Sequence, residues 1–394
     1  MKQLFLAFAC LIPTIIYAQT VKTDVLVLGN DDAAYSSGLQ VARSGANVVI
    51  LTQSAAFNLD EIKSKKSVEI YKMYVSAQQK IVAFSNNLAK NTTIDKKKKS
   101  AKVKIDSTKL FSVINNAPLL EIKRSGSGWE AKISKDKSIK AKVLIIANNG
   151  KEVLPMLNMT NLKTADLSTL NYSGNLYRTT IAGVSGTPDF LSLYHLLLPD
   201  QENLLYINQS NAEIGQAAGA VAAYASFFKT KTSLSNLKII QGELLNYKLS
   251  LMPFDDVKIT DSNWLAIQKT GITGILKADL KNGKAFFNPE NEVLYDEIKQ
   301  PIKDYYYKAQ IWFDDHQNIP INLENTISMV SYVGNKAIDA TKAELEKKWN
   351  KNYRFSSKYD LKKVLTRREF SVIINEYLKP FDDVNVDRTG SVIR

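Results

Sequence analysis

Two continuous apolar runs, separated by a polar and then helix-like segment, mark the stretch from Asp24 to Thr52. The run from Asp24 to Gly29 is apolar and predicts a buried strand, and the run from Asn47 to Thr52 predicts a second one. Between them, Asn30 to Gly45 open with polar residues and continue with helical spacing. A strand, a tight loop, a helix and a second strand make the opening unit of a dinucleotide-binding α/β fold.

The loop of this unit departs from the usual glycine pattern. Gly-x-Gly-x-x-Gly/Ala is expected, and the three positions are Gly29, Asp31 and Ala34. At about 4 Å and an effective dielectric near 20, the Asp31 carboxylate would repel a phosphate by roughly 4 kcal/mol. Alternatively, Asp31 or Asp32 caps the helix and takes the N–H groups that a pyrophosphate would use. Thr52 stands where an acidic residue commonly binds ribose hydroxyls.

Strand-like runs follow in the middle of the chain. They cover Leu119–Lys123, Trp129–Ile133 and Ile139–Ala147, and Gly126 and Gly128 predict a hairpin bend between the first two. The last run continues as Ala-Asn-Asn-Gly. This pattern adds further strands to the predicted sheet.

Two helical segments are also predicted. Leu59–Leu88 has the spacing of one or two amphipathic helices. Asn203–Asn208 predicts a strand, followed by a helix over Glu213–Ala225 that is rich in Gly and Ala. Small residues there suit close packing on a cofactor or on a neighbouring element.

On these residues the chain resembles FAD-dependent oxidoreductases of the glutathione-reductase-like type, and more narrowly the secreted bacterial members called xanthan-lyase-like. The resemblance implies an α/β fold: a Rossmann-like FAD/NAD(P)-binding domain with a mostly helical C-terminal domain. It implies FAD as cofactor, with the late strand passing beside it and the Gly-Gln-Ala-Ala-Gly helix pointing its N-terminus at the flavin. The cofactor-binding positions carried over are Gly29, Asp31, Ala34, Thr52, Ala147, Gly150, Gly215, Gln216 and Gly219.

The chain departs from that family at several of these places. Asn148 and Asn149 replace a Thr-Gly pair, and only Gln209–Ala212 joins the late strand to its helix. The segment Gly150–Arg178 is short where relatives carry a large cap. Two functions stay open: a secreted FAD-dependent oxidoreductase with a degenerate flavin site and unknown substrate, or a cofactor-free pseudoenzyme scaffold.

The region after residue 250 follows a different pattern. Phe254–Val257 and the later Leu365–Phe370 resemble parts of S-layer-homology modules. Thr366 and Glu369 have the spacing of a capping box, so they are structural or ligand-binding residues. We expect three units: a signal peptide at 1–18, an FAD/NAD(P)-binding-like domain at 19–250 and a helical region at 251–394. Under the scaffold hypothesis, the helical region binds an envelope glycan or a protein partner.

Export is indicated by the first residues. Met1–Ala18 has Lys2, an apolar run and a small residue at its end, as in a signal peptide, so a secreted or periplasmic protein without a transmembrane segment is expected. Cys10 is the only cysteine, which excludes disulfides and thiol chemistry after cleavage. The net charge is +13, with its densest runs at Lys63–Lys66 and Lys96–Lys99. These runs suit solvated loops, and nucleic acid is not expected as a partner.

The inventory of catalytic groups is sparse. The two histidines are His195, in an apolar context that favours packing, and His316, expected at the surface. Their spacing does not predict a metal site, and no catalytic residue can be named. Any chemistry would have to come from a cofactor acting on an unknown small molecule.

Overall fold

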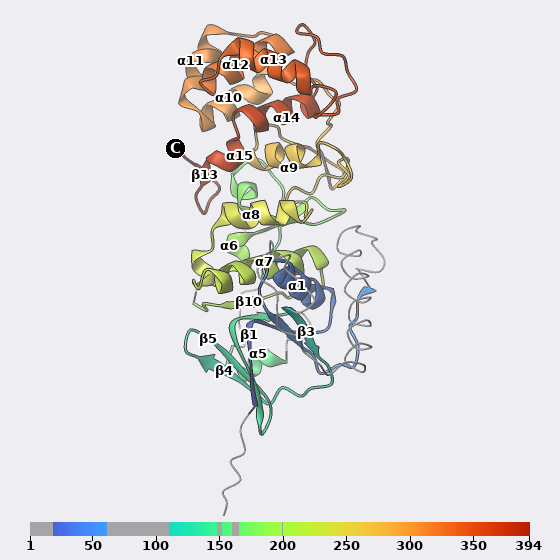
Figure 1. Cartoon of the computed structure of the whole chain (residues 1–394), viewed down its shortest axis with the longest axis vertical. Coiled ribbons are helices and arrows are strands. Elements are labelled where there is room, and N and C mark those ends of the chain that lie inside the picture. Colours follow the sequence, from blue (N-terminus) through green and yellow to red (C-terminus); the bar gives the residue numbers. More distant parts are fainter. Residues whose placement is uncertain (1–18, 61–109, 148–151, 160–164, 199) are drawn as a thin grey trace, which may run out of the picture.

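The computed structural model describes residues 19–60, 110–147, 152–159, 165–198 and 200–394. Figure 1 shows a mixed sheet at one end of the long axis and the C-terminal helices at the other. The predicted signal peptide, both lysine runs, almost all of Leu59–Leu88 and the Asn148–Gly150 turn lie outside the described residues.

A seven-stranded sheet forms the first part of the molecule. Its order is β3-β2-β1-β6-β5-β4, and β10 pairs with the C-terminal half of β6. The strands β3, β2, β1, β6 and β10 are mutually parallel, whereas β4, β5 and β6 form an antiparallel meander. The bounds are β1 Gln19–Leu28, β2 Val48–Leu51, β3 Phe111–Ile114, β4 Glu121–Ser125, β5 Gly128–Ser134, β6 Lys137–Ile146 and β10 Leu204–Tyr206.

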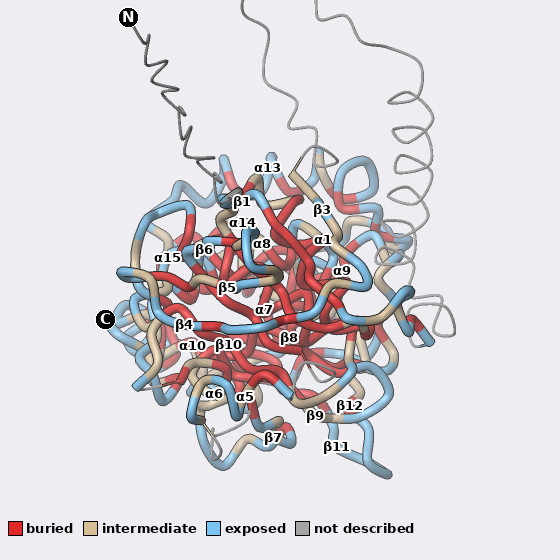
Figure 2. Tube along the Cα trace, turned by 90° about the horizontal axis from the view of Figure 1, so that it is seen from below, coloured by how far each residue is buried: buried red, intermediate tan, exposed pale blue. Residues whose placement is uncertain are grey.

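Both faces of the parallel strands are covered. Successive side chains point to opposite faces, so Val25 and Val27 join one hydrophobic cluster while Leu26 and Leu28 join another. The first face packs against α1 (Asp32–Arg43) and α7 (Ala212–Phe227), and the second against Trp129. Figure 2 shows the buried chain running through the middle of the molecule along α7, β8 (Thr180–Gly183) and β10. The near-continuous apolar strands are those of a parallel sheet buried on both sides.

The predicted hairpin is present with shifted bounds. Gly126 has φ +62° in the bend between β4 and β5. Gly128 lies so close to β6 that a β-carbon there would stand 2.2 Å from the Ala141 carbonyl oxygen. Close backbone approach therefore explains one glycine and turn geometry the other. The strand β3 was not predicted.

A small second sheet and several short helices connect the two parts. The sheet has the order β7-β9-β8, with bounds Ser168–Thr169, Asp189–Ser192 and Thr180–Gly183. The helices are α5 Val153–Met156, η2 Leu176–Thr179, α6 Leu193–Leu196, η3 Thr232–Leu234 and α8 Leu237–Asn246.

The C-terminal part is mainly helical, as expected. Its helices are α9 Trp264–Thr273, α10 Tyr295–Tyr305, α11 Tyr307–Asp315, α12 Leu323–Val333, α13 Ile338–Lys348, α14 Arg367–Tyr377 and α15 Pro380–Asp383. Two short hairpins pair β11 Asp279–Lys281 with β12 Lys284–Phe286, and β13 Asn385–Val386 with β14 Val392–Ile393. In the described ranges, no helix combines the length and hydropathy needed to cross a bilayer.

The junction between the two parts is tightly bonded. The Gln268 side chain accepts the backbone N–H groups of Leu251 (2.9 Å) and Met252 (2.8 Å) and donates to the Met252 carbonyl (3.1 Å). One hydrophobic cluster extends from the sheet through Leu251 to Ile373. The division at residue 250 stays a prediction about folding units.

Candidate functional site

The loop after β1 closes tightly on the end of β6. Gly29 has φ +144°, and its N–H donates to the Leu51 carbonyl at 3.2 Å. A β-carbon at Gly29 would stand 2.8 Å from the Ala147 β-carbon and 3.2 Å from that of Ala34. Three predicted positions therefore meet here, and they form a packed turn.

The second position of the loop caps α1. The Asp31 carboxylate accepts the N–H of Ala34 at 2.9 Å, and the residue is only 1% exposed. Asp32 follows in the first turn and is also buried. A helix N-terminus carries roughly half a positive charge and is where a pyrophosphate would bind. At α1 this place is taken by the chain's own carboxylate, as the capping alternative predicts.

Thr52 is also engaged within the chain. Its hydroxyl accepts the N–H of Ser54 at 3.0 Å, in a turn that follows β2, and the residue is buried. Its backbone N–H donates to Ile114 at 3.0 Å. Gly150, the remaining position of this group, lies outside the described residues.

The glycines of α7 contact α1. A β-carbon at Gly215 would stand 2.4 Å from the Ala33 carbonyl oxygen, and one at Gly219 would stand 2.5 Å from that of Ser37. The amide of Gln216 donates to Gln40 of α1 at 3.0 Å. Of the two roles expected for these small residues, close packing on a neighbouring element is the one that Gly219 shows. These three positions thus build a helix–helix contact.

The contact register shows that the two helices run parallel. Residue 33 meets 215 and residue 37 meets 219, so both N-termini lie at the same end. The Asn211 side chain caps α7 by accepting the N–H of Ile214 at 2.9 Å. Glu213 in its first turn is 6% exposed and accepts the Ser185 hydroxyl at 3.0 Å. Each helix therefore begins with buried carboxylates of the chain itself.

FAD would place its pyrophosphate at these helix starts. A pyrophosphate needs N–H groups and positive charge, and here Asp31 takes the N–H of Ala34 while Asp32 and Glu213 occupy the first turns of their helices. Repulsion between one carboxylate and one phosphate charge about 4 Å apart costs roughly 4 kcal/mol at an effective dielectric near 20. A micromolar cofactor has about 8 kcal/mol of binding free energy to lose. At the start of α1, the N–H of Ala34 is therefore bonded to Asp31 and is not free for a pyrophosphate.

The two histidines lie in different parts of the fold and each contacts its own neighbours. His195 in α6 has its Nδ1 3.2 Å from the Asp166 carbonyl and 3.3 Å from the Ser168 hydroxyl. His316 is half-buried, and its ring stacks on Trp312. In the described part of the chain, no three His, Cys, Asp or Glu side chains come together as metal ligands.

A polar pocket lies beside the N-terminus of α14. Its volume is about 260 Å³, and it is lined by Asp261, Ser262, Asn263, Glu290, Arg354, Phe355, Ser356, Thr366, Arg368 and Glu369. Arg368 is paired with Asp261 at 2.6 Å and with Glu290 at 2.7 Å. These ion pairs hold α14 against the segment before α9 and the loop before α10.

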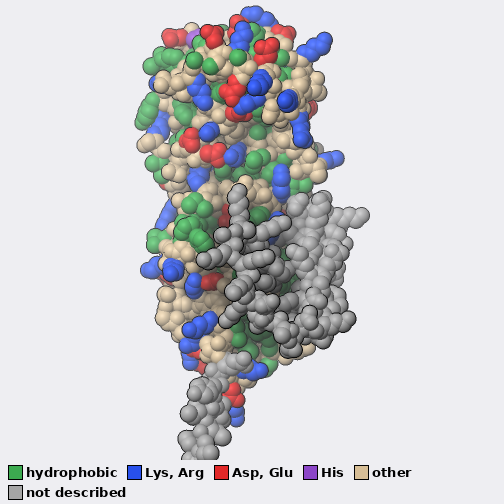
Figure 3. Space-filling view, in the orientation of Figure 1, with side chains coloured by type: hydrophobic (Ala, Val, Ile, Leu, Met, Phe, Trp, Pro, Cys, Tyr) green, Lys and Arg blue, Asp and Glu red, His purple; other side chains and the backbone are tan. Residues whose placement is uncertain are grey.

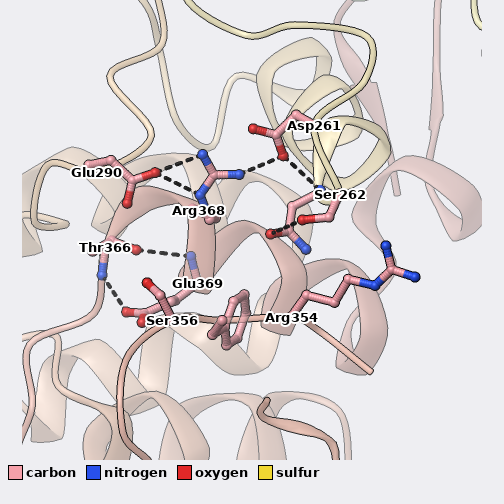
Figure 4. A pocket seen from close by; sticks show the side chains of 10 residues that line it. Asp261, Ser262, Glu290, Arg354, Ser356, Thr366, Arg368 and Glu369 are labelled. Atoms are coloured by element: carbon pink, nitrogen blue, oxygen red, sulfur yellow. Dashed lines mark hydrogen bonds and ion pairs between the residues drawn. The ribbon is translucent and has the colours of Figure 1, made fainter. Parts of the chain in front are cut away.

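The capping box in this pocket is confirmed. The Thr366 hydroxyl accepts the N–H of Glu369 at 3.2 Å, and the Glu369 carboxylate accepts that of Thr366 at 2.9 Å. Figure 4 shows the Arg354 side chain turned away from the Arg368 ion pairs. Within the described residues, no carboxylate pairs with Arg354. Nothing in the sequence pattern points to Arg354, Ser262 or Ser356.

No family model and no curated protein matches the chain. Similar solved structures include a bacillithiol disulfide reductase from Staphylococcus aureus, at 12% identity over 32% of this chain and 42% of that chain (TM-score 0.19). A thioredoxin reductase from Gloeobacter violaceus matches at 13% identity over 33% and 37% (TM-score 0.19). A flavoprotein/dehydrogenase from Cytophaga hutchinsonii matches at 16% identity over 37% and 43% (TM-score 0.24).

The matches span less than half of each of those chains. Their names include reductases and a flavoprotein/dehydrogenase, but a likeness with TM-scores this low carries no weight for function. The α/β fold with its helical C-terminal part rests on the strand order and helices of this chain.

Proposed function

We propose that this protein is a cofactor-free, exported scaffold on a flavin-type fold that binds a glycan of the cell envelope through its C-terminal helices. The observation that carries the first part is the Asp31 carboxylate, which is buried and bonded to the N–H of Ala34 at the start of α1. Export is proposed from the signal-like residues 1–18.

A flavoenzyme is the second candidate, and one observation favours it. The parallel order β3-β2-β1-β6-β10 places α1 and α7 side by side with their N-termini at one end. Dinucleotide folds bind their cofactors at the C-terminal ends of such strands. The carboxylates at both helix starts weigh against this candidate.

Absorption spectroscopy separates the two candidates. The purified full-length protein should show no flavin bands and should not bind added FAD in a titration. Asp31→Gly is the informative variant, because it removes the carboxylate and leaves a residue that the loop tolerates. Binding of FAD by this variant alone would identify Asp31 as the obstacle. Flavin bound to the unmodified protein would overturn the cofactor-free proposal.

The second part of the proposal rests on the pocket beside α14. Arg354 and Ser356 are exposed there next to the buried ring of Phe355, and Ser262 lies opposite. A guanidinium with hydroxyl groups suits an acidic sugar, since it can bind a carboxylate in a bidentate manner. The S-layer-homology resemblance of Leu365–Phe370 supports an envelope glycan.

Binding to polygalacturonate, with dextran as a neutral control polymer, tests this part. We expect the full-length protein to sediment with the acidic polymer and Arg354→Ala to do so more weakly. Arg394→Ala is the matched control, because it also removes one arginine from the helical region. A role for this pocket would be contradicted if all three proteins sedimented equally with the acidic polymer, or if none of them sedimented with it.

A further inference from the structure

Four large apolar side chains are exposed where α7 ends and α8 begins. Phe227 and Leu234 are 66% and 64% exposed, and Phe228 and Ile239 are about half exposed. The two phenylalanines end α7, Leu234 closes η3, and Ile239 lies in the first turn of α8. Both η3 and α8 pack against α7, so these four side chains share one corner of the molecule, which we call the apolar corner.

The main chain beneath the apolar corner is fixed by hydrogen bonds. The chain turns back at Lys229, which has φ +52°, and the Thr230 N–H donates to the Ala225 carbonyl at 3.0 Å. Thr232 is buried; its N–H donates to the Asn203 side chain at 3.1 Å, and its hydroxyl accepts the Asn203 N–H at 3.0 Å. The apolar side chains are therefore held at the surface by an anchored backbone.

The apolar corner projects from the surface. Successive residues of a helix point about 100° apart, so a helix lying flat on a core turns at most one of two neighbours fully outward. Phe227 and Phe228 are both exposed because α7 ends there and the chain turns away. Their ring centroids are 5.1 Å apart, and that of Phe228 is 4.6 Å from the Tyr224 ring. A projecting apolar surface suits a flat, deformable partner better than a peptide, which needs a groove.

The size of the apolar corner argues against a second copy of this chain as the partner. At about 150–250 Å² for an aromatic side chain and somewhat less for Leu or Ile, the four side chains expose roughly 300–500 Å². A stable protein–protein interface buries about 800 Å² on each partner. Patches of about 300–600 Å² on a monomer are often functional.

Basic side chains border the apolar corner. Lys229 and Lys231 are exposed beside it, and among the described residues neither has a carboxylate within ion-pair distance. The neighbouring Glu202 carboxylate instead accepts the N–H of Ser233 at 3.2 Å and its hydroxyl at 2.5 Å. Figure 3 shows hydrophobic side chains gathered at the left edge, at the height of α7 and α8, with Lys and Arg side chains directly below them. Apolar and positive surface are thus adjacent.

This combination fits the surface of an anionic membrane. Peripheral proteins bind bilayers through buried apolar area together with attraction to anionic lipids. We propose that the apolar corner docks on an anionic bilayer, with its aromatic side chains at the level of the headgroups and the two lysines against the lipid phosphates. This role belongs to the sheet-bearing part of the chain and is independent of glycan binding by the helices.

A tryptophan placed in the apolar corner tests the proposal directly. The four tryptophans of the chain are all buried, so Phe227→Trp adds an exposed one that reports its own position. The probe is a vesicle of phosphatidylglycerol and phosphatidylcholine in equal parts, with brominated acyl chains. We expect the emission of the full-length Phe227→Trp protein to shift to shorter wavelength and to be quenched. Tyr307→Trp, at a position of α11 that is 74% exposed, is the matched control and should stay unquenched.

Paired variants measure what each kind of side chain contributes. Leu234→Ser and Leu294→Ser make the same change at leucines that are 64% and 65% exposed, and Leu294 lies outside the apolar corner at the start of α10. We expect Leu234→Ser to weaken sedimentation with the anionic vesicles about fivefold and Leu294→Ser to leave it unchanged. Lys231→Gln should weaken it about fivefold, whereas Lys347→Gln, on the exposed side of α13, should not.

Two further measurements keep this proposal separate from the others. Arg354→Ala alters the pocket beside α14 and should leave vesicle binding unchanged. Equal sedimentation of Leu234→Ser and Leu294→Ser, or an unquenched Phe227→Trp protein, would overturn the proposal, because any remaining binding would come from other segments. A dimer in lipid-free solution that Leu234→Ser abolishes would also overturn it, since a second copy would then cover the apolar corner.

Discussion

Gly219 of α7 lies against the carbonyl oxygen of Ser37 in α1, with room for a hydrogen but not for a methyl group. A β-carbon there would stand 2.5 Å from that oxygen, and the neighbouring Gln40 β-carbon is 2.9 Å away. The first of these atoms is a main-chain oxygen and the second is a β-carbon, so neither can move away by rotation of a side chain. The parallel contact between the two helices depends on this fit.

Gly219→Ala should therefore destabilise the protein, by roughly 1–3 kcal/mol for overpacking. Gly242→Ala is the matched control, because Gly242 lies inside α8 with nothing within 4 Å of its would-be β-carbon. The same change there should stabilise by about 0.5–1 kcal/mol through helix propensity. Urea unfolding measures both, and equal effects of the two variants would mean that α7 does not pack as described.

The opening unit could be predicted because its signals are local. Two apolar runs, a glycine at the turn and a helix between them need no knowledge of the rest of the chain, and α1 and β2 lie where they are expected. The strand β1 begins at Gln19 rather than at Asp24, because the polar residues before Asp24 pair with β6 as well. The small residues of α7 likewise predict close packing. What they pack against is set by the tertiary fold, and the partner is α1.

The role of the Asp31 side chain could not be predicted from the sequence. A carboxylate beside a helix start can cap the helix or face solvent, and only the folded loop decides between them. Apart from Thr366 and Glu369, the pocket beside α14 could not be predicted for a related reason, since its lining comes from segments that the sequence does not place together. The stacking of His316 on Trp312 had one signal: the two residues are four apart, which puts them on one helix face.

Asp31→Ala should lower the free energy of unfolding by about 1 kcal/mol, the usual cost of losing an N-cap. Asp31→Asn retains a side-chain acceptor and should cost less. Asp339→Ala is the control, because Asp339 is an exposed first-turn residue of α13. We expect that change to stay within about 0.5 kcal/mol. Denaturation midpoints of the three variants would decide whether Asp31 supports α1.

Arg367 links three segments from a largely buried position. Its guanidinium donates to the Phe287 carbonyl at 2.7 Å and to the Lys277 carbonyl at 2.6 Å, and it pairs with Glu297. Arg367→Met would leave these acceptors unpaired and should cost about 3–5 kcal/mol. Arg367→Lys should recover only part of this loss, since an ammonium cannot reproduce the planar fork.

Arg354→Met provides the comparison for that test, because it makes a similar change at an exposed arginine of the helical part. Its effect on stability should stay within about 0.5 kcal/mol. A small effect of Arg367→Met in thermal and urea unfolding would show that these segments are held together by other contacts.

Because of Lys238 in α8, the free energy of unfolding should change with pH in the alkaline range. Burial lowers its pKa to about 8, Arg178 and Lys269 act in the same direction, and Asp382 opposes them. Its ammonium lies 4.5 Å from the Phe381 ring centroid. Below pH 8 the lysine is charged in both states, so the folded state bears the full cost of burying the charge. Between about pH 8 and 10.5 the folded state has lost the proton and the unfolded state has not, so this cost falls as the pH rises.

Lys238→Met should accordingly be more stable than the unmodified protein at pH 7, by roughly 1–3 kcal/mol. The advantage should shrink steadily as the pH is raised from 8 to 10.5. Lys347→Met, at an exposed position of α13, should show no such trend, and it corrects for the other groups that titrate in this range. Urea unfolding at several pH values gives the difference directly. An advantage of Lys238→Met that is absent at pH 7, or that grows toward pH 10, would show that the lysine is not buried as a charge.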